Sequence, residues 1–356
     1  MKVINIAIVG IGRIGWPMAN GEISKYYSDK YKIVAACDLV EERRNRMANT
    51  FGCKTYSEYA EMLKQDDIDI VYVATRSCDH HKHALMALKA GKDVLLEKPA
   101  TISYEEILDL YKYANKEGTP KLYVHQQRRF EDAFMKVMDI VNSGKLGKIY
   151  EINTEQNDFQ HRDDWQTISE FGGGQLLNWG PHIIDQSLKL LGTSSFEMQS
   201  YLHHVAAGGD CEDHLRIRFI GDNDRVVNMC ISGGMAINRG RYYQVYGDRG
   251  AAFFNNEKIR LRYIDPAQEV PEIISSPETP GAAFGKSGTY ESSFTINWIE
   301  EEIEAVAGGT TMADFWQYLY DSYVNGAEFP ITDEDILSIM RTISAVKAQN
   351  KHIMNH

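Results

Sequence analysis

The sequence predicts two domains: an N-terminal α/β domain with a doubly wound parallel sheet, and a C-terminal domain built on a large, mostly antiparallel open sheet. Three observations support this prediction. The chain has 356 residues, which is too long for one typical domain. Up to about residue 120, almost wholly apolar segments alternate with helical patterns, as in a parallel sheet covered on both faces. From about residue 150, apolar and polar residues alternate, as in a sheet with one wet face.

The first domain is predicted over residues 1–124. Its apolar strands are expected at residues 4–10, 32–38, 69–75, 93–99 and 121–127. The helices between them are expected to pass through Ala19 and Ile23 and then, in order, to end at Gly52, Gly91 and Gly118. Glycine is the usual residue just past a helix end. The last of these helices is expected to begin at Ser103, which has capping-box spacing to Glu106.

The second domain is predicted over residues 125–356, and a helix over 130–143 leads into it. Its alternating strands are expected at residues 148–158, 213–221, 225–234 and 242–250. A glycine-rich turn and a helix over 172–191 lie between the first two of these strands. The tail from Ile296 is expected to be helical, with a break at 326–332.

Composition narrows the class of protein. The net charge of −12 argues against a nucleic-acid binder and against a polybasic membrane anchor. Five scattered cysteines without a C-x-x-C pair indicate a reducing compartment. The apolar start of the chain fits a buried strand better than a signal peptide, and no segment is long enough to span a membrane. We therefore expect a cytoplasmic protein. The histidines at 80, 81 and 83 and the segment 211–214 lack the spacing of a metal site, so no metal is expected.

A dinucleotide site is predicted where the first strand ends. The segment VGIGRIG (9–15) has the G-x-G-x-x-G pattern, follows an apolar strand and opens a helix. Gly10 permits the turn, Gly12 lets a pyrophosphate approach the backbone, and Gly15 lets the helix pack on the strand. The loop residues Ile11, Arg13 and Ile14 complete the expected phosphate cradle at the helix N-terminus.

Asp38 supplies the second half of this pattern. It ends the second strand, where a carboxylate accepts hydrogen bonds from an adenosine ribose and repels a 2′-phosphate. Leu39 and Val40 follow it, so no arginine is immediately adjacent. The prediction is NAD in preference to NADP, although Arg43 and Arg44 keep NADP open.

Several segments together resemble the GFO/IDH/MocA oxidoreductases, a family named after glucose–fructose oxidoreductase and inositol dehydrogenase. The main one is ALMALKAGKDVLLEKPA (84–100), in which a helix end runs into a strand that stops at Glu-Lys-Pro. FGGGQLLNWGPHIIDQSLKLLG (171–192) resembles the family's GGG-x-L-x-D-x-G-x-H-x-x-D segment. Similar text occurs at 127–130, 144–149, 246–250 and 329–335. The resemblance covers nearly the whole chain and implies a Rossmann domain followed by a substrate and oligomerisation domain.

The resemblance implies that Lys98 and His182 act together on a substrate hydroxyl. Lys98 ends a parallel strand, at the sheet edge where ligands bind, and partial burial would lower its pKa. Pro181 favours the first turn of a helix, so His182 lies at the positive end of the helix dipole, which favours a neutral imidazole. Asn178 stands where many family members have aspartate. An amide cannot take a proton, but it can bind a substrate hydroxyl.

Further site residues are expected around this pair. On the cofactor side they are Thr75, Arg76, His80, Glu97, Lys98 and Gln127. His80 is expected to line the nicotinamide pocket, while Arg76 lies along the pyrophosphate or faces solvent. On the substrate side Asp185 is expected to orient the His182 ring or bind a hydroxyl. Arg162 and Trp165 either contact the substrate or serve only in the loop and its packing. Gly172–Gly174 are expected to let the chain pass close to the nicotinamide.

These residues predict an NAD-dependent dehydrogenase that acts on a sugar, a cyclitol or a similar polyhydroxylated small molecule. Two alternatives remain open: a glycosidase of the same family that oxidises its substrate transiently, and a non-catalytic sensor of NAD or sugar. The resemblance also implies a homodimer or homotetramer through the exposed face of the second sheet. Residues 151–157 and 215–231 are the expected contact surface.

Overall fold

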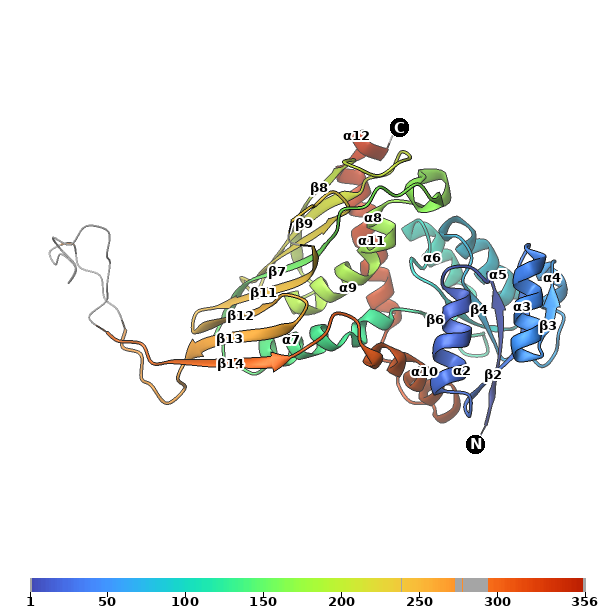
Figure 1. The fold of residues 1–356 in the computed structure, drawn as a ribbon, viewed down its shortest axis with the longest axis horizontal. Helices are drawn as coiled ribbons and strands as arrows, with labels where there is room; N and C mark the ends of the chain where they lie inside the picture. The colour runs from blue at the N-terminus through green and yellow to red at the C-terminus, as the bar shows by residue number, and fades with distance from the viewer. Residues whose placement is uncertain (1, 238, 273–276, 278–293, 355–356) are drawn as a thin grey trace.

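The computed structural model describes residues 2–237, 239–272, 277 and 294–354. Two sheets organise these residues, one in each half of the molecule (Figure 1). The first sheet has six strands and the second has eight. The predicted fold class, a doubly wound parallel sheet followed by a mostly antiparallel open sheet, is confirmed.

The first sheet is parallel throughout and has the strand order β3-β2-β1-β4-β5-β6. Its strands are β1 (Ile4–Val9), β2 (Tyr31–Cys37), β3 (Lys54–Tyr56), β4 (Ile70–Val73), β5 (Asp93–Leu96) and β6 (Leu122–Val124). The chain order reverses at β1, which has β2 on one side and β4 on the other. The carboxyl ends of strands at such a switch point form the usual ligand-binding edge of this fold.

Helices cover both faces of this sheet. They are α1 (Gly15–Pro17), the π-helical turn η1 (Met18–Ile23), α2 (Ser24–Tyr26), α3 (Glu41–Phe51), α4 (Tyr59–Met62), the 3-10 turn η2 (Ser77–Asp79), α5 (His80–Lys89) and α6 (Tyr104–Leu110). Ser103 caps α6 as predicted, because its side chain accepts the Glu106 N–H. The helix does not reach Gly118, however. Asn115 adopts a left-handed conformation and its amide binds the backbone of Leu122, so the chain turns into β6 early.

The second sheet has the order β14-β13-β12-β11-β7-β10-β9-β8. Only the β7–β10 pair is parallel. Its strands are β7 (Ile149–Asn157), β8 (Phe196–His203), β9 (His214–Gly221), β10 (Val226–Ser232), β11 (Gly240–Gly247), β12 (Gly250–Phe254), β13 (Lys258–Ile264) and β14 (Trp298–Glu304).

Strand β14 corrects the prediction of a wholly helical tail from Ile296. The segment WIEEEIE pairs antiparallel with β13 along its whole length. Its outward glutamates meet the outward cations of β13: Glu302 binds Lys258 and Arg260, and Glu300 binds Arg262. These cross-strand ion pairs favour the extended form of a segment whose glutamates suit a helix equally well.

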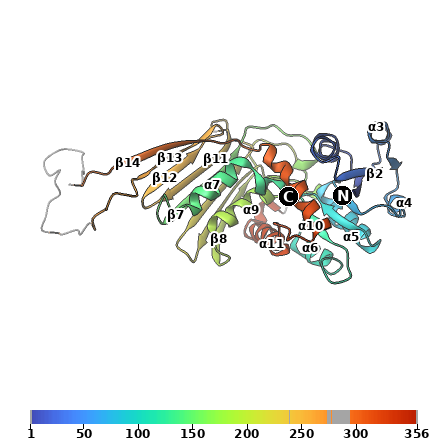
Figure 2. The same cartoon turned by 90° about the horizontal axis from the view of Figure 1, so that it is seen from below.

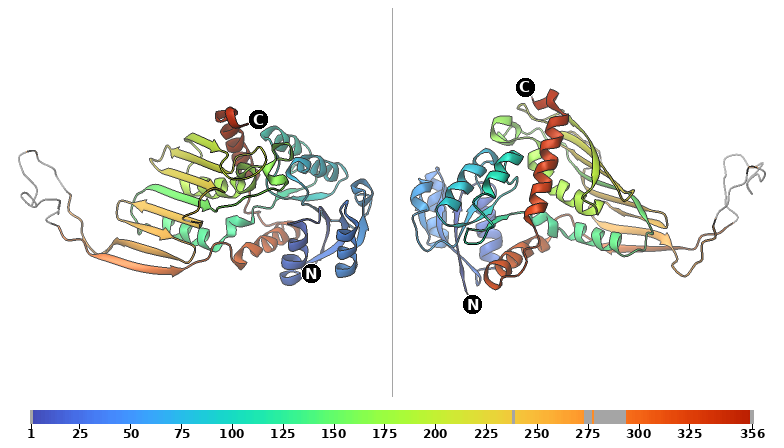
Figure 3. Two further views of the ribbon diagram at one scale, coloured as in Figure 1. Left: turned by 45° about the horizontal axis from the view of Figure 1, so that its top comes forward. Right: turned by 180° about the vertical axis from the view of Figure 1, so that it is seen from behind.

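Among the described residues, helices cover one face of the second sheet and leave the other face bare (Figure 2). The long helices of this half are α7 (Asp132–Asn142), α9 (Gly180–Leu191), α10 (Asp314–Asn325) and α11 (Asp333–Gln349). The short ones are η3 (Gln127–Phe130), η4 (Trp165–Thr167), η5 (Ser169–Phe171), α8 (Gln175–Asn178), η6 (Thr310–Ala313) and α12 (Lys351–Met354). Helix α11 stands between the two halves, where it contacts both α6 and α9 (Figure 3).

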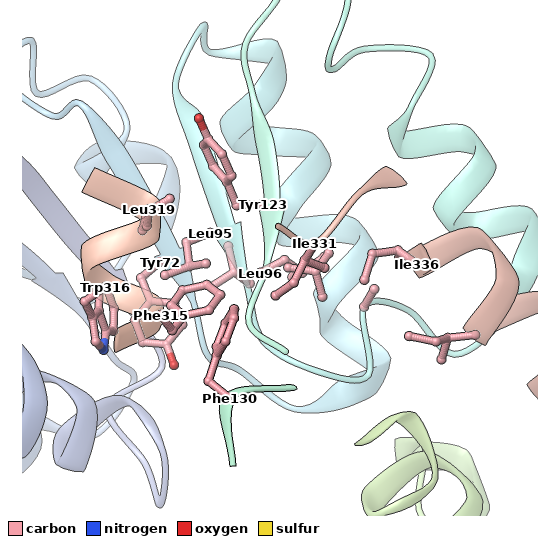
Figure 4. Close-up of a cluster of buried hydrophobic side chains, with 14 of the residues drawn as sticks. Tyr72, Leu95, Leu96, Tyr123, Phe130, Phe315, Trp316, Leu319, Ile331 and Ile336 are labelled. Carbon is pink, nitrogen blue, oxygen red and sulfur yellow. The ribbon is translucent and has the colours of Figure 1, made fainter. Parts of the chain in front are cut away.

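Helix α10 returns to the first domain and packs beside its sheet. Trp316 and Phe315 are fully buried there, next to Tyr72 of β4 (Figure 4). The Tyr31 hydroxyl of β2 donates to the Trp316 carbonyl, and the Trp316 indole donates to Glu22. A segment near the C-terminus therefore completes the core of the N-terminal half.

In the part of the chain that the structure describes, none of the helices combines the length and apolar character that a membrane span needs. Within those same residues, His, Cys, Asp and Glu side chains nowhere gather in a group of three that could hold a metal ion.

Candidate active site

The glycine loop after β1 is shaped by close packing at two of its three glycines. Gly10 has φ +90°, and a Cβ there would lie 2.5 Å from the Ala74 carbonyl oxygen at the end of β4. A Cβ on Gly15 would lie 2.1 Å from the Gly10 carbonyl oxygen. A Cβ on Gly12, by contrast, would meet nothing within 4 Å. The open space at Gly12 fits a pyrophosphate, which needs backbone without a side chain.

Asp38 follows β2 at the same edge of the sheet and is 9% exposed. One carboxylate oxygen accepts the Ile11 N–H at 2.7 Å, and the other accepts the Val40 N–H at 2.9 Å. The Arg43 guanidinium lies 3.4 Å from the carboxylate. An arginine therefore reaches Asp38 from the next helix, although none follows it directly in the sequence.

The other predicted cofactor residues of the loop have different surroundings. Ile11 is fully buried and Ile14 is exposed. The Arg13 guanidinium donates to Asp164 at 2.8 Å and to Gln166 at 3.2 Å, both of which belong to the second domain. Arg13 thus links the glycine loop to the other half of the molecule.

Gln127 lies just after β6, at the same edge of the sheet. Its side-chain oxygen is buried and has no hydrogen-bond partner among the described residues. A buried acceptor without a partner is costly, so this atom fits a ligand that brings a donor. The open space at Gly12, the carboxylate of Asp38 and this acceptor together fit a dinucleotide.

Lys98 reaches from the end of β5 into the second domain. Its ammonium donates to the Asn178 carbonyl oxygen of α8 at 3.0 Å. Burial lowers the pKa of Lys98 to about 8; Glu97 opposes this shift, while Arg128 and Arg162 add to it. At neutral pH the lysine is therefore still mostly an ammonium, but it loses its proton more easily than an exposed lysine.

His182 lies in the first turn of α9 and is 4% exposed. Burial holds its pKa well below the ordinary histidine value, and the charges of Lys98 and Arg128 lower it further. Its Nδ1 atom is buried and has no partner among the described residues. The Gln126 amide donates to the Pro181 carbonyl at 2.9 Å and fixes this helix start against the end of β6.

The Glu97 side chain, predicted on the cofactor side, is occupied by contacts within the protein. Glu97 is 3% exposed, and its two oxygens accept three donors from the protein itself. One oxygen accepts from Tyr72 and His125, and the other accepts the Lys98 N–H. Glu97 therefore braces the turn that carries Lys98.

Asp185, predicted to orient the His182 ring or to bind a substrate hydroxyl, has an arginine as its partner. Its two oxygens pair with the Arg129 guanidinium in a buried ion pair, and Arg129 also binds Asp335. Asp185 shares a helix face with His182, but its partner comes from η3. The carboxylate is therefore occupied in joining α9 to η3 and the start of α11, and it does not contact the His182 ring.

His80 joins the turn that follows Lys98 to the end of β4. The His80 Nδ1 atom lies 2.7 Å from the Pro99 carbonyl, and its Nε2 atom lies 3.2 Å from the Thr75 carbonyl. His80 is 2% exposed and braces this turn, and its place in the nicotinamide pocket stays a prediction. Arg76 binds Asp79 and stacks on the Phe171 ring of the second domain.

The glycine run 172–174 is explained by the protein's own chain. A Cβ on Gly172 would strike Ile102 and Ser77 of the first domain, and a Cβ on Gly174 would strike the Glu212 carboxylate. Both glycines have positive φ. Gly172 therefore allows close contact between the two domains, and Gly174 allows close contact within the second domain.

Arg162 and Asn178 line a small cavity at the substrate side of the site. The Arg162 guanidinium binds both Asp164 oxygens and Gln166, and the Gln166 amide lies 3.4 Å from the Asn178 side-chain oxygen. Trp165 is half-buried beside them and opens η4. These residues form the wall of the site opposite the glycine loop.

The sequence reading missed Arg128 as a site residue. It lies 4.4 Å above the Trp179 ring, donates to Glu131, and its charge acts on both Lys98 and His182. The sequence does indicate this position, since the segment QRRF begins shortly after β6, at the ligand edge of the sheet. Asp164 and Gln166 gave no such signal, because Arg13, the partner that ties them to the glycine loop, lies far away in the chain.

A glycine loop, a carboxylate and a basic residue at the carboxyl edge of a doubly wound sheet, faced by a histidine from a second domain, define a dinucleotide-dependent oxidoreductase class. A family model described as "Oxidoreductase family, NAD-binding Rossmann fold" matches residues 4–125. A second one, "GFO/IDH/MocA C-terminal domain", matches residues 134–253. The chain therefore belongs to the GFO/IDH/MocA family of oxidoreductases.

Individual relatives are distant in sequence but similar over their full length. A scyllo-inositol 2-dehydrogenase (NADP(+)), IolW of Bacillus subtilis (strain 168), is 23% identical over 99% of this chain and 95% of its own. An NAD-binding protein from Listeria innocua has a TM-score of 0.78 at 22% identity, covering 99% of this chain and 96% of that chain. GenD2 from gentamicin A biosynthesis, solved in complex with NAD, has a TM-score of 0.76 at 17% identity over 99% and 95%. These structures share the fold of this protein.

Proposed function

We propose that the protein is an NAD-dependent dehydrogenase that oxidises a CH–OH group of a sugar, a cyclitol or a related polyol. The observation that supports it most is the meeting of two basic side chains from different domains. The Lys98 ammonium contacts α8, and its charge acts on His182 of α9. The inositol dehydrogenase among the relatives agrees with a polyol substrate.

Each of the two residues has a separate role in this proposal. The neutral His182 imidazole accepts the hydroxyl proton, since burial disfavours a charge on this ring in the free protein. The Lys98 ammonium donates a hydrogen bond to the same hydroxyl oxygen and stabilises the negative charge that develops there. Asn178 and Arg162 orient the substrate. A bound dinucleotide supplies the two-electron acceptor for the carbinol hydride.

Substitution Lys98→Met tests the proposal. Turnover of the best substrate in a panel of cyclitols and aldoses should fall about 10²–10⁴-fold, because the group that stabilises the oxyanion is lost. The affinity for NAD should change little. Lys92→Met is the matched control, because Lys92 precedes the same strand at its opposite end and binds the carbonyls of Asp66 and Ile68. Unchanged turnover in Lys98→Met would remove Lys98 from the reaction.

The same panel separates the two alternative functions. A glycosidase would release an aglycone from a glycoside with no net NADH. A sensor would bind NAD or a sugar and give no absorbance change with any compound in the panel. Net NADH formation that is lost in Lys98→Met excludes both.

For the cofactor we propose NAD over NADP, because the Asp38 carboxylate stands where a 2′-phosphate would enter. Arg43 is the opposing feature, since its guanidinium lies beside that carboxylate and the relative IolW is named for NADP(+). In Arg43→Ala, the ratio of kcat/KM for NAD to that for NADP should rise. A ratio that already favours NADP in the unaltered protein would contradict the choice of NAD.

A further inference from the structure

A buried group of three polar side chains lies directly beneath Lys98. Tyr72 of β4, Glu97 after β5 and His125 after β6 come from three neighbouring strands of the parallel sheet. One Glu97 oxygen lies 2.5 Å from the Tyr72 hydroxyl and 2.5 Å from His125 Nδ1. None of the three is more than 3% exposed. We call them the Tyr72–Glu97–His125 triad.

The triad holds a carboxylate charge in a place without water. The second Glu97 oxygen accepts the Lys98 N–H at 3.0 Å, so both oxygens have donors. Burial acts to raise the pKa of Glu97, but His125, Lys98 and Tyr72 outweigh it and hold that pKa below its usual range. Donors to the ionised form are what keep a buried carboxylate charged. Glu97 is therefore a fixed anion at neutral pH.

Helix α10 seals the triad from the other side. The His125 ring packs 4.5 Å from Phe315 and 5.6 Å from Trp316, centroid to centroid, and Tyr72 packs against the same indole (Figure 4). His125 Nε2 is buried in this apolar box and has no partner among the described residues. His125 therefore takes part in the triad through its Nδ1 atom, and Glu97 supplies the carboxylate.

The charges around Lys98 show why this anion matters. Arg128 of η3 and Arg162 of the loop before η4 face Lys98 and both lower its pKa, as burial does. His182 faces it from α9, and the Asn178 carbonyl faces it from α8. Glu97 acts in the opposite sense and favours the ammonium. Without Glu97, Lys98 would lie buried among cations.

We propose that the Tyr72–Glu97–His125 triad keeps Lys98 protonated, with Glu97 supplying the charge and Tyr72 and His125 acting as positioning residues that keep Glu97 ionised. The proposal rests on the proposed dehydrogenase function only for the use made of the ammonium. The triad itself touches neither substrate nor cofactor.

The first test measures the pKa of Lys98 without any reaction. The rate at which acetic anhydride labels Lys98 is followed by peptide mass spectrometry across neutral and alkaline pH. In Glu97→Gln the pKa of Lys98 should fall by about one pH unit or more, because an adjacent opposite charge is lost. Tyr72→Phe with His125→Phe should move it in the same direction, and Tyr72→Phe alone should move it less.

Tyr31→Phe is the matched control for packing. Tyr31 is a buried tyrosine against the same Trp316, but its hydroxyl donates to a backbone carbonyl and not to Glu97. Its variant should leave the pKa of Lys98 unchanged. Circular dichroism identifies variants that fail to fold, and Tyr72→Phe, which removes one oxygen atom, remains informative if the double variant does not fold. A pKa of Lys98 that is the same in folded Glu97→Gln as in the unaltered protein overturns the proposal.

The second test uses the reaction. The alkaline fall of kcat/KM should move to lower pH in Glu97→Gln by the same amount as the labelling curve, while the acid side stays in place. A purely structural role would lower kcat/KM at every pH without moving the curve, and this outcome would also overturn the proposal. If the unaltered protein oxidises no polyol, the dehydrogenase function fails, whereas the labelling experiment still decides the role of the triad.

Discussion

Lys98 and His182 approach the candidate site from different domains, and burial lowers the pKa of both. The proposed roles need an ammonium at Lys98 and a neutral imidazole at His182. We therefore expect kcat/KM for oxidation to be flat near neutral pH and to fall as pH rises through about 8, where Lys98 loses its proton. The acid limb should lie well below the ordinary histidine value of 6.5. Activity that rises through pH 8 would instead make Lys98 the base.

The buried ion pair of Arg129 and Asp185 should matter for stability. Arg129→Met leaves the Asp185 carboxylate buried without its cation, and such a loss costs about 3–5 kcal/mol. The free energy of unfolding in urea measures this cost. Lys189→Met is the comparison, since Lys189 is 40% exposed and pairs with Asp335 at the surface. The free energy of unfolding should fall much less in Lys189→Met, and equal decreases in the two variants would contradict the argument.

The sequence could predict the position of a single residue where its neighbours in the chain determine that position. The end of β5 put Lys98 at the ligand edge of the sheet, and Pro181 put His182 in the first turn of a helix. Asp185 could not be assigned in this way. Its spacing to His182 was visible in the sequence, but Arg129 comes from another element, and only the tertiary packing shows that pair.

At the scale of the element, different glycines of the glycine loop serve packing and ligand binding. Gly15→Ala should destabilise the fold, because its Cβ would meet the Gly10 carbonyl. Gly12→Ala should fold normally and lose NAD affinity at least about tenfold, because its Cβ enters only open space reserved for the ligand. Thermal unfolding and NAD titration give the two readouts. Gly21→Ala, also in open space but in the following helix, should affect neither.

Apolar strands and glycine-ended helices of the first domain were predictable, because each is specified by its own residues. Strand β14 was not. Its glutamates suit a helix as well as a strand edge, and the decision depends on the cations of β13 that lie beside them. The early end of α6 has the same origin, since Asn115 turns the chain through a contact with β6.

At the scale of the whole molecule, the bare face of the second sheet is the expected contact between copies. Tyr242 and Phe253 stack on this face with ring centroids 6.3 Å apart, and Phe253 is 37% exposed. Tyr242→Glu with Phe253→Glu should shift the protein from dimer or tetramer to monomer in light scattering, because an unpaired charge is costly when a contact between copies buries it. Tyr26→Glu, at an exposed position in the first domain, should not. A monomer before any substitution would refute the expectation.

The return of α10 to the first sheet has a consequence for synthesis. Translation delivers all six strands of that sheet before residues 314–325 exist, so Tyr31, Tyr72 and His125 must wait for the aromatic side chains that shield them. Nascent chains arrested after Val124 should therefore bind a chaperone or an apolar dye more strongly than chains arrested beyond Asn325. The first domain can begin to form early on the ribosome, but its core is completed only near the end of translation.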